Sequence, residues 1–290
     1  MCRSKRRLYW SYQGNFTKMG PRSVSNIINL GGTILRSARS KEFRTEEGRQ
    51  KAFEQCQKNG IDALVCIGGD GTFTGAKIFA EEFGVKVIGV PGTIDNDIFG
   101  TDFTIGYDTA LNTAMEAIDK IRDTATSHNR VFFIEVMGRD AGFIALNSGI
   151  ASGALDILIP EKKDSLEDLF ETFEKAQKRG KTSSIVIVAE GERLASTYEL
   201  AEQTKQRFPD YDIRVSILGH IQRGGAPSCA DRVLASRMGY GAVVGLMKGL
   251  TNVMAGIRSN DLVFTPIEDA IKKHNEINQD LLQIAEILAM

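Results

Sequence analysis

Residues 63–83 read ALVCIGGDGTFTGAKIFAEEF, and this stretch decides the fold class. Its first part, Ala63–Ile67, is a short apolar run typical of a strand, and the glycine-rich turn Gly68–Thr72 follows it directly. The next segment, near Phe73–Phe83, has the period of a helix. Short strands that alternate with longer helical segments are typical of parallel sheets covered by helices on both faces, and the sequence therefore predicts an α/β fold.

The same alternation continues along the chain. Five further runs rich in β-branched residues are expected to be strands: Val85–Val90, Val131–Val136, Ile157–Pro160, Ser184–Ala189 and Ile213–Leu218. Around Leu111, apolar residues recur at the spacing of one buried helix face: Leu111, Met115, Ile118 and Ile121. Further helices are expected near Ser165–Lys178, Ser196–Phe208 and Asp231–Leu246.

Composition narrows the function classes. The 290 residues have a formal net charge of -1, with 42% hydrophobic and 25% charged residues, so no overall field attracts nucleic acid or a membrane surface. Only four cysteines occur and none form a Cys-x-x-Cys pair, which argues against a zinc site or a disulfide framework. No apolar stretch is long enough to span a bilayer and no apolar signal core follows the basic start. We therefore expect a cytoplasmic protein with neither nucleic acid nor membrane as partner.

Glycine and polar clusters follow five of the expected strands: Gly68–Thr72, Pro91–Asp97, Met137–Arg139, Glu190 and Gly219–Arg223. Open parallel sheets bind ligands at the carboxyl ends of their strands. We therefore expect these clusters to line one shared cleft.

Gly68–Thr72 lies between a strand and a helix, so its backbone N–H groups can point at an anion with support from the helix dipole. Small residues let a phosphate approach the main chain, and Asp70 could hold Mg²⁺ bridging phosphate oxygens. The turn lacks the lysine of a Walker-type loop. The alternative is that it is only a tight connection from strand to helix.

Pro91–Asp97 carries two carboxylates, Asp95 and Asp97, just after a strand. In extended backbone these two residues and Thr93 would share a side, with Asn96 turned away. One carboxylate could then take a proton from an attacking hydroxyl while the other coordinates a metal. The alternative is a turn in which Asp and Asn merely satisfy backbone groups.

Three cationic or ionisable side chains follow other strands: Arg139, His220 and Arg223. A guanidinium matches a phosphate monoester in shape and charge, and the sequence predicts that Arg139 stands at the start of a helix. Each of these residues taken singly is more often a surface ion-pair partner or a structural residue. Their joint occurrence at strand ends favours an anionic substrate.

Taken together, the chain from about Arg22 to near the C-terminus resembles the bacterial ATP-dependent 6-phosphofructokinase family. Five ordered motifs carry the resemblance: Gly68–Thr72, Pro91–Asp97, Val136–Arg139, Leu218–Gly225 and Asp231–Arg237. The resemblance implies two Rossmann-like three-layer α/β/α domains. Residues 1–106 plus about 222–270 would bind the nucleotide, and residues 107–221 plus about 271–290 would bind the sugar phosphate.

The implied reaction is phosphorylation of fructose 6-phosphate at its 1-hydroxyl by MgATP in glycolysis. The implied catalytic residues are Asp95 as base, with Thr93 and Arg139. The implied sugar-phosphate contacts are Thr93, Ile94, Asp95, Arg130, Met137, Gly138, Arg139, Glu190, Arg214, His220, Ile221, Gln222 and Arg223. The implied nucleotide contacts are Arg39, Ser40, Gly69, Asp70, Gly71 and Thr72, with Asp70 and Asp97 toward Mg²⁺.

The resemblance also implies assembly and regulation. Arg130 and Arg214 match positions that reach into a neighbouring subunit's site, which predicts a homotetramer. Arg22, Arg122 and Lys181 match positions that bind the effectors ADP or phosphoenolpyruvate. Leu155 stands where many members have an effector-metal glutamate, so we expect weakened or altered allosteric control.

Two positions separate ATP from pyrophosphate as phosphoryl donor. The pyrophosphate-using branch of the family usually has Asp at the position of Gly71 and Lys at the position of Gly92. A carboxylate at 71 would repel the nucleotide's α-phosphate, so the sequence favours ATP, with a pyrophosphate-dependent enzyme as the alternative.

The family pattern begins with a strand, a Gly-Gly-Asp-x-Pro-Gly loop and a helix, which are not found in this sequence. The first domain is therefore expected to be incomplete at its N-terminus, with neighbouring strands left unpaired and an apolar face exposed. Two accounts stay open: a start codon assigned too far downstream, or a truncated, non-catalytic subunit.

Overall fold

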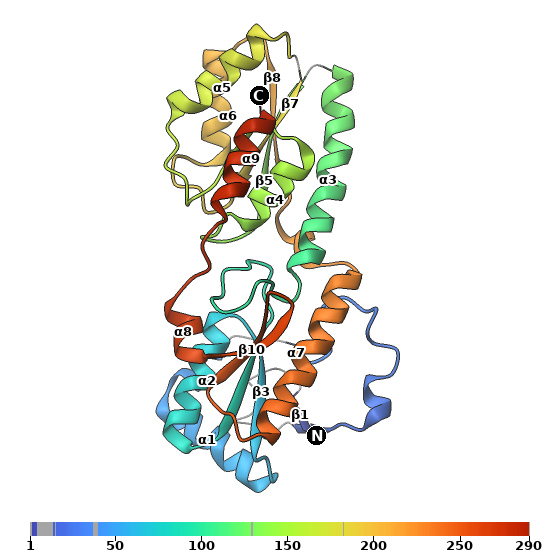
Figure 1. Ribbon diagram of the computed structural model, residues 1–290, viewed down its shortest axis with the longest axis vertical. Helices are drawn as coiled ribbons and strands as arrows, with labels where there is room; N and C mark the ends of the chain where they lie inside the picture. The colour runs from blue at the N-terminus through green and yellow to red at the C-terminus, as the bar shows by residue number, and fades with distance from the viewer. Residues whose placement is uncertain are drawn as a thin grey trace. The chain divides into compact units, whose positions relative to one another are not determined.

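The computed structural model describes residues 2–4, 14, 16–36, 40–128, 130–181 and 183–289 (Figure 1). The chain forms two compact units, each made of three segments of the sequence. The first unit holds Met1–Thr93, Ile98–Gly106 and Gly225–Asn275, and the second holds Ile94–Asp97, Tyr107–Gly224 and Glu276–Met290. The nucleotide and sugar-phosphate roles assigned to the two halves remain predictions. The predicted nucleotide contact Arg39 lies outside the described residues.

The first unit contains a four-stranded sheet with the order β10-β9-β4-β3. β3 (Ala63–Gly68) and β4 (Lys86–Pro91) are parallel, and β4 is also parallel to β9 (Val253–Arg258). β9 turns back into β10 (Asp261–Pro266) through Ser259 and Asn260, which have φ values of 48° and 68°. This two-residue hairpin makes the sheet mixed, whereas the sequence predicted only parallel strands and did not predict β9 or β10.

Helices cover both faces of this sheet. One face packs Cys66, Val87 and Met254 in a core with α2 (Asp70–Phe83) and α8 (Ile267–Lys272). The other face packs Ile88 and Ala255 against α7 (Cys229–Met247). Figure 1 shows α2 and α8 on one side of the sheet and α7 on the other. Because successive strand residues point to opposite faces, one sheet supplies both cores.

The second unit contains a four-stranded sheet with the order β6-β7-β5-β8, in which every pairing is parallel. The strands are β5 (Arg130–Val136), β6 (Asp156–Leu158), β7 (Ser184–Ala189) and β8 (Asp212–Ile217). Alternate residues of β5 enter different cores, Phe132 and Ile134 on one face and Val131 and Phe133 on the other.

The helices of the second unit are divided between those two faces. α3 (Tyr107–His128), α4 (Phe143–Ser152) and α9 (Gln279–Ala289) cover the first core, and α5 (Leu166–Lys178) and α6 (Thr197–Arg207) cover the second (Figure 1). Three layers of helix, sheet and helix are thus present in each unit. The predicted α/β fold is confirmed.

The remaining elements are short. β1 (Cys2–Ser4) pairs antiparallel with β2 (Phe16–Lys18), and α1 (Glu46–Lys58) follows two 3-10 helices, η1 (Pro21–Val24) and η2 (Glu42–Arg44). A third, η3 (Gly219–Arg223), follows β8. Within the described residues, no helix is long and apolar enough to cross a membrane.

β3 forms the edge of the first unit's sheet and pairs, among the described residues, with β4 on one side. Two of its apolar side chains, Val65 and Ile67, are 38% and 41% exposed. This edge agrees with the expectation that the first domain has a strand left unpaired on one side and an apolar face exposed.

Candidate functional site

The strand-end clusters are divided between the two units, so each unit's residues are described on their own. In the first unit, β3 ends at Gly68 and Gly69 is the N-cap of α2. The N–H groups of Thr72 and Phe73 donate to the carbonyl of Gly69 at 2.9 and 3.1 Å. Asp70 begins the helix, and a Cβ added at Gly71 would meet no described atom within 4 Å. The positive end of the dipole of α2 therefore lies at the glycine-rich turn, where an anion site would need it.

The segment Pro91–Asp97 is bent rather than extended, which corrects the expectation that Thr93, Asp95 and Asp97 share one side. The chain bends at Ile94 and Asp95, and Asn96 has φ 56°, in the left-handed region. Asparagine tolerates this region better than most residues because its side chain can bond locally. The division between the units falls here too, with Thr93 in the first and Asp95 in the second.

Asp95 is buried, with 5% of its surface exposed, and Asn96 is equally buried. Its neighbour Ile94 packs into the core of the second unit with Tyr107 and Met137. On the other side, the carbonyl of Thr93 accepts a hydrogen bond of 2.7 Å from the Thr104 hydroxyl. The two residues that precede Asp95 are thus both held, and Asp95 itself is buried.

A second loop, Met137–Gly142, follows β5 in the same unit. Gly138 has φ 149° and Arg139 has φ 55°, so two successive residues adopt uncommon backbone conformations. One carboxylate oxygen of Glu190, Oε1, accepts from the N–H of Arg139 at 2.6 Å and from that of Gly138 at 3.3 Å. Arg139 therefore stands in a tight loop, not at the start of a helix as predicted, since α4 begins at Phe143.

Gly191 allows this loop to lie close to β7. A Cβ added at Gly191 would lie 2.0 Å from the carbonyl oxygen of Arg139. No other residue fits without moving that peptide. Sequence reasoning named Glu190 and missed Gly191, although a glycine after a functional residue at a strand end is a signal of close backbone approach.

The turn Gly219–Arg223 is built around Gln222, which is 1% exposed. Its Oε1 accepts from the N–H of Met137 at 3.3 Å, and its Nε2 donates to the carbonyl of Gly219 at 3.1 Å. The predicted substrate contacts His220, Ile221 and Arg223 are exposed on the same turn. Gln222 thus joins the turn after β8 to the loop after β5, so the turn that carries His220 and Arg223 is fixed against the Arg139 loop.

The predicted neighbour-subunit residues lie at the opposite end of this sheet. Arg130 begins β5 and Arg214 lies near the start of β8, and both contact the carboxylate of Asp212. Arg130 Nε lies 2.8 Å from Asp212 Oδ2, and Arg214 Nε lies 3.0 Å from Oδ1. The hydrogen bond from Arg130, with that from Arg214, lowers the pKa of Asp212. Two like charges that would repel each other are held side by side by one carboxylate that the sequence analysis did not single out.

Two of the three predicted effector residues, Arg122 and Lys181, lie in the second unit, and Arg22 lies in the first. Partial desolvation, then the charges of Arg122 and Arg179, lower the pKa of Lys181. The neighbouring arginines destabilise the charged form of Lys181, and a bound anion would offset that repulsion. Lys181 is therefore a suitable contact for an anion. Leu155, at the position of the family's effector-metal glutamate, is buried in the core at 2% exposure.

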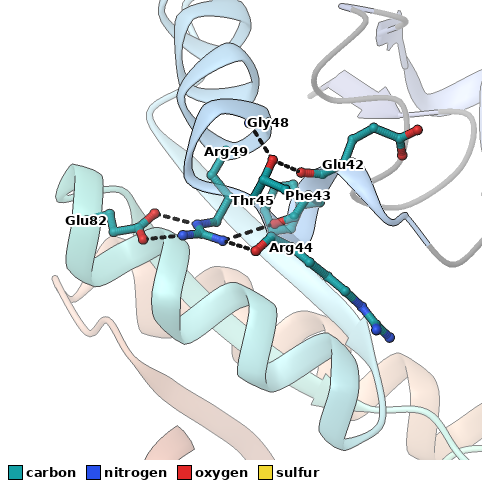
Figure 2. Close-up of polar contacts among 7 residues, drawn as sticks. All are labelled: Glu42, Phe43, Arg44, Thr45, Gly48, Arg49 and Glu82. Carbon is teal, nitrogen blue, oxygen red and sulfur yellow. Dashed lines mark hydrogen bonds and ion pairs between the residues drawn. The ribbon is translucent and has the colours of Figure 1, made fainter.

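Ser40, a predicted nucleotide contact, lies just before η2. Figure 2 shows how Arg49 holds Phe43 and Arg44 of that short helix. The Ser40 hydroxyl accepts from the N–H of Phe43 at 3.0 Å. The Arg49 guanidinium donates to the carbonyls of Phe43 and Arg44 at 3.3 and 2.9 Å, and to both carboxylate oxygens of Glu82 at 2.5 and 2.6 Å. Because Glu82 lies in α2, this contact ties η2 to the helix that begins at the glycine-rich turn.

Comparison with known proteins identifies the family. The sequence model of the family described as Phosphofructokinase matches residues 8–246. The chain is 53% identical to ATP-dependent 6-phosphofructokinase 2 of Bacteroides thetaiotaomicron over 98% of its own length and 88% of that protein.

Two solved structures share the fold. A phosphofructokinase structure from Saccharomyces cerevisiae superposes with a TM-score of 0.90 at 33% identity, covering 93% of this chain and 41% of that one. A pyrophosphate-dependent phosphofructokinase structure from Marinobacter aquaeolei matches with a TM-score of 0.82 at 20% identity, covering 99% and 82%, and this likeness concerns the fold alone. This chain belongs to the ATP-dependent 6-phosphofructokinase family.

Proposed function

We propose that this chain transfers the γ-phosphoryl group of ATP to the 1-hydroxyl of fructose 6-phosphate, a step of glycolysis, in the cytoplasm. The observation that carries the proposal is the 53% identity to an ATP-dependent 6-phosphofructokinase over 98% of the chain. In this reaction the sugar oxygen forms a bond to the γ-phosphorus, the bond from that phosphorus to the β-γ bridging oxygen breaks, and ADP leaves.

Asp95 is the proposed general base. Its carboxylate would take the proton of the 1-hydroxyl as the oxygen attacks, which keeps positive charge from building up on that oxygen. Burial at 5% exposure and the contacts of Thr93 and Ile94, which precede it, support this role, because a base must hold its position relative to the reacting hydroxyl. Thr93 and Arg139 would orient the hydroxyl and stabilise negative charge on the transferring group.

The sugar phosphate would be held by the residues of the second unit that follow β5, β7 and β8. Arg223 and His220 are exposed on one turn and could hold the 6-phosphate with charge-assisted hydrogen bonds. Glu190 would accept from sugar hydroxyls with the oxygen that the backbone amides leave available, beside the backbone of Met137 and Gly138. Ile94, Ile221 and Gln222 would complete the lining of this site.

The nucleotide would be held by the glycine-rich turn Gly69–Thr72, together with Ser40 and Arg39. Magnesium would be held by Asp70 and Asp97, whose carboxylates are the hard oxygen ligands that this ion prefers. When bound there, the ion would offset the negative charge of the phosphates. Among the described residues no group of three or more metal-ligating side chains occurs. That donor set suits magnesium, which is usually bound through one or two carboxylates, substrate phosphates and water.

ATP is favoured over pyrophosphate as the donor. The match to an ATP-dependent enzyme is 53% identical, whereas the pyrophosphate-dependent structure from Marinobacter aquaeolei is 20% identical. Gly71 also leaves room beside the turn, because a Cβ there would meet no described atom within 4 Å.

A homotetramer is proposed, in which Arg130 and Arg214 serve a neighbouring subunit. They lie at the amino ends of β5 and β8, while Met137, Glu190 and the turn Gly219–Arg223 follow the carboxyl ends of strands in the same sheet. A site for ADP or phosphoenolpyruvate is proposed around Arg122 and Lys181, with Arg22 as a further contact. Because Leu155 is a buried apolar residue, control through this site is expected to be weakened or altered.

Replacing Asp95 tests the function. Asp95→Ser should lower kcat with fructose 6-phosphate and ATP by about three orders of magnitude, because the base is lost. Binding of fructose 6-phosphate, measured by calorimetry, should stay within about threefold, because the phosphate contacts remain. The control is Asp119→Ser, an exposed aspartate of α3, which should leave both values unchanged. Preserved turnover in Asp95→Ser would refute the base assignment, and turnover of the unmodified chain with pyrophosphate alone would refute the donor assignment.

A further inference from the structure

The loop Met137–Gly142, which carries Arg139, is anchored at both of its ends. Glu190 holds the beginning, through the N–H groups of Gly138 and Arg139. At the end, Glu161 Oε1 accepts a hydrogen bond of 2.8 Å from the N–H of Gly142. Between these anchors the N–H of Ala141 donates to the carbonyl of Gly138 at 3.0 Å, which closes a tight turn. Fixing both ends of so short a turn fixes the residue at its apex, Arg139.

Glu161 accepts a hydrogen bond from the backbone of the residue at the start of α4. Gly142 is the N-cap of α4 and has no side chain to accept from the first N–H groups of the helix. A side chain there would clash, since an added Cβ would lie 2.6 Å from Ile159 Cβ and 2.7 Å from Glu161 Oε2. The carboxylate is thus packed against the glycine, and its negative charge is stabilised at the positive end of the helix.

The connection that carries Glu161 is itself restrained. The N–H of Lys162 donates to the carbonyl of Ile159 at 3.1 Å, and the Lys162 ammonium lies 2.9 Å from Asp164 Oδ1. The same ammonium lies 3.9 Å from Glu286 of α9. Glu161 is exposed, yet its backbone is fixed on both sides, so it can hold the loop rather than follow it.

We propose that Glu161 is a positioning residue for the sugar-phosphate site: it holds Gly142 so that Arg139 keeps its left-handed backbone and its guanidinium stays aimed before substrate arrives. The proposal rests on the proposed role of Arg139 in that site. A left-handed arginine is strained, and such a conformation persists only where the surroundings hold it. Glu190 is already proposed to bind the sugar, so Glu161 is the anchor of this loop that has no proposed contact with substrate.

Three measurements on purified variants of this chain test the proposal. Amide hydrogen exchange of the peptide that covers residues 137–142 reports on the loop without substrate or activity. Calorimetric binding of fructose 6-phosphate and steady-state kinetics report on the site. Glu161→Ala removes the acceptor, whereas Glu161→Gln keeps an oxygen that can accept from Gly142 and therefore should rescue. Glu171→Ala, which removes an exposed carboxylate that contacts Lys175 of the same helix, is the control.

In Glu161→Ala, exchange in residues 137–142 should be about tenfold faster, and the KM and Kd for fructose 6-phosphate should rise by about tenfold with a smaller change in kcat. Glu161→Gln should recover most of both effects, and Glu171→Ala should show neither. Glu161→Asp, whose carboxylate is one methylene too short, provides the comparison if the alanine variant does not fold.

Unchanged exchange in Glu161→Ala would overturn the proposal, as would faster exchange with unchanged sugar-phosphate affinity. Equal losses in the glutamine and alanine variants would overturn it too, because the oxygen of glutamine preserves the hydrogen bond. If the unmodified chain does not bind fructose 6-phosphate, the proposed function fails, and the exchange comparison still decides whether Glu161 holds the loop.

Discussion

Asp156, the first residue of β6, is a carboxyl placed where its charge is costly. Burial raises its pKa to about 6, against the opposing hydrogen bond from the N–H of Ile157 to its Oδ1 and the charge of Lys162. Asp164 raises the pKa further by like-charge repulsion, and Thr172 donates a hydrogen bond that lowers it. The folded protein therefore binds the proton of Asp156 more tightly than the unfolded chain does.

The raised pKa of Asp156 determines how the stability of the protein changes with pH. Between the unfolded pKa, near 4, and the folded value of about 6, the folded state holds more protons, so stability falls as pH rises through that window. Asp156→Asn should remove the dependence, because the amide keeps an acceptor for the Ile157 N–H and carries no charge. Melting temperatures of both proteins from pH 4 to pH 7.5 should diverge as pH rises, with the variant the more stable near neutrality. The control variant Asp119→Asn should give a curve of melting temperature against pH that runs parallel to that of the unmodified protein. A parallel curve for Asp156→Asn would contradict this account.

Gly191 supports a prediction at the same scale. Gly191→Ala would place a Cβ 2.0 Å from the carbonyl oxygen of Arg139, so that peptide must move. We expect a rise of at least about tenfold in the KM for fructose 6-phosphate, since a displaced phosphate or hydroxyl ligand loses about 1.4 kcal/mol or more. Gly71→Ala is the matched control, because the Cβ added there meets no described atom. This variant should leave the KM for fructose 6-phosphate unchanged.

At the residue scale, the sequence indicated which charged side chains stand at the strand ends. It could not indicate the backbone conformation of those residues. Asp95, Arg139 and Glu190 stand at strand ends as predicted from the alternation of strands and helices. Asn96 and Arg139 adopt left-handed conformations that no periodicity predicts. These conformations depend on contacts from residues far along the chain, such as Glu190, and a local pattern contains no information about such contacts.

The Arg49 contact joins three elements, α1, η2 and α2 (Figure 2). It is bidentate, and the Arg49 side chain is mostly covered, with 11% of its surface exposed, while the Glu82 side chain is 30% exposed. The pKa of Glu82 is lowered, first by the hydrogen bond from Arg49, and that of Arg49 is raised by the same bond. Planar matching of guanidinium and carboxylate makes such a pair stronger than a single surface contact.

A double-mutant cycle on Arg49→Met and Glu82→Gln should give a coupling of about 1 kcal/mol in the free energy of unfolding. The control cycle uses Lys120 and Glu116, an exposed pair four residues apart with side chains 72% and 71% exposed. That pair should couple by about 0.3 kcal/mol. Arg49→Met should also cost more than Glu82→Gln, because it alone leaves the carbonyls of Phe43 and Arg44 without their donor. Equal couplings in the two cycles would contradict the interpretation.

The predicted elements and the observed ones agree best where both faces of a strand are buried. The runs Val131–Val136 and Ser184–Ala189 were placed to within a residue, since a continuous apolar run has one interpretation in a parallel sheet. β9 and β10 were missed because the pair is antiparallel at a sheet edge and carries a mixed pattern. The signal that could have identified them is the turn Ser259-Asn260 between two apolar runs, since such two-residue loops favour left-handed conformations.

At the scale of the whole molecule, the sequence indicated two domains and approximate borders. It placed residues 94–97 with the first half of the chain, whereas the structure groups Ile94–Asp97 with Tyr107–Gly224. The packing of Ile94 against Tyr107 and Met137 explains this assignment. Composition does not reveal that Ile94–Asp97 belongs to the second unit, because Ile94 is its one apolar residue and an isoleucine could pack in the core of either unit.

The proposed tetramer permits a complementation test. If Asp95 acts in its own subunit's site and Arg214 acts in a neighbour's, then Asp95→Ser and Arg214→Ala should each be nearly inactive, and co-assembled mixtures should regain activity because some sites are complete. Asp95→Ser mixed with Arg139→Ala should regain none, because both residues belong to the same unit of one chain. Mixtures of the first pair no more active than their sum would contradict the assignment of Arg214 to the neighbouring subunit.

The interleaving of the two units also governs the order in which the chain can fold during synthesis. When residue 224 has left the ribosome, β4 still lacks its partner β9, and the sheet of the first unit lacks α7. The core of the second unit is also incomplete at that point, because it still lacks Leu281, Leu282 and Ala285 of α9, which pack against it. The contacts that complete both cores come from the last quarter of the chain, so we expect neither unit to fold completely before those residues have been synthesised.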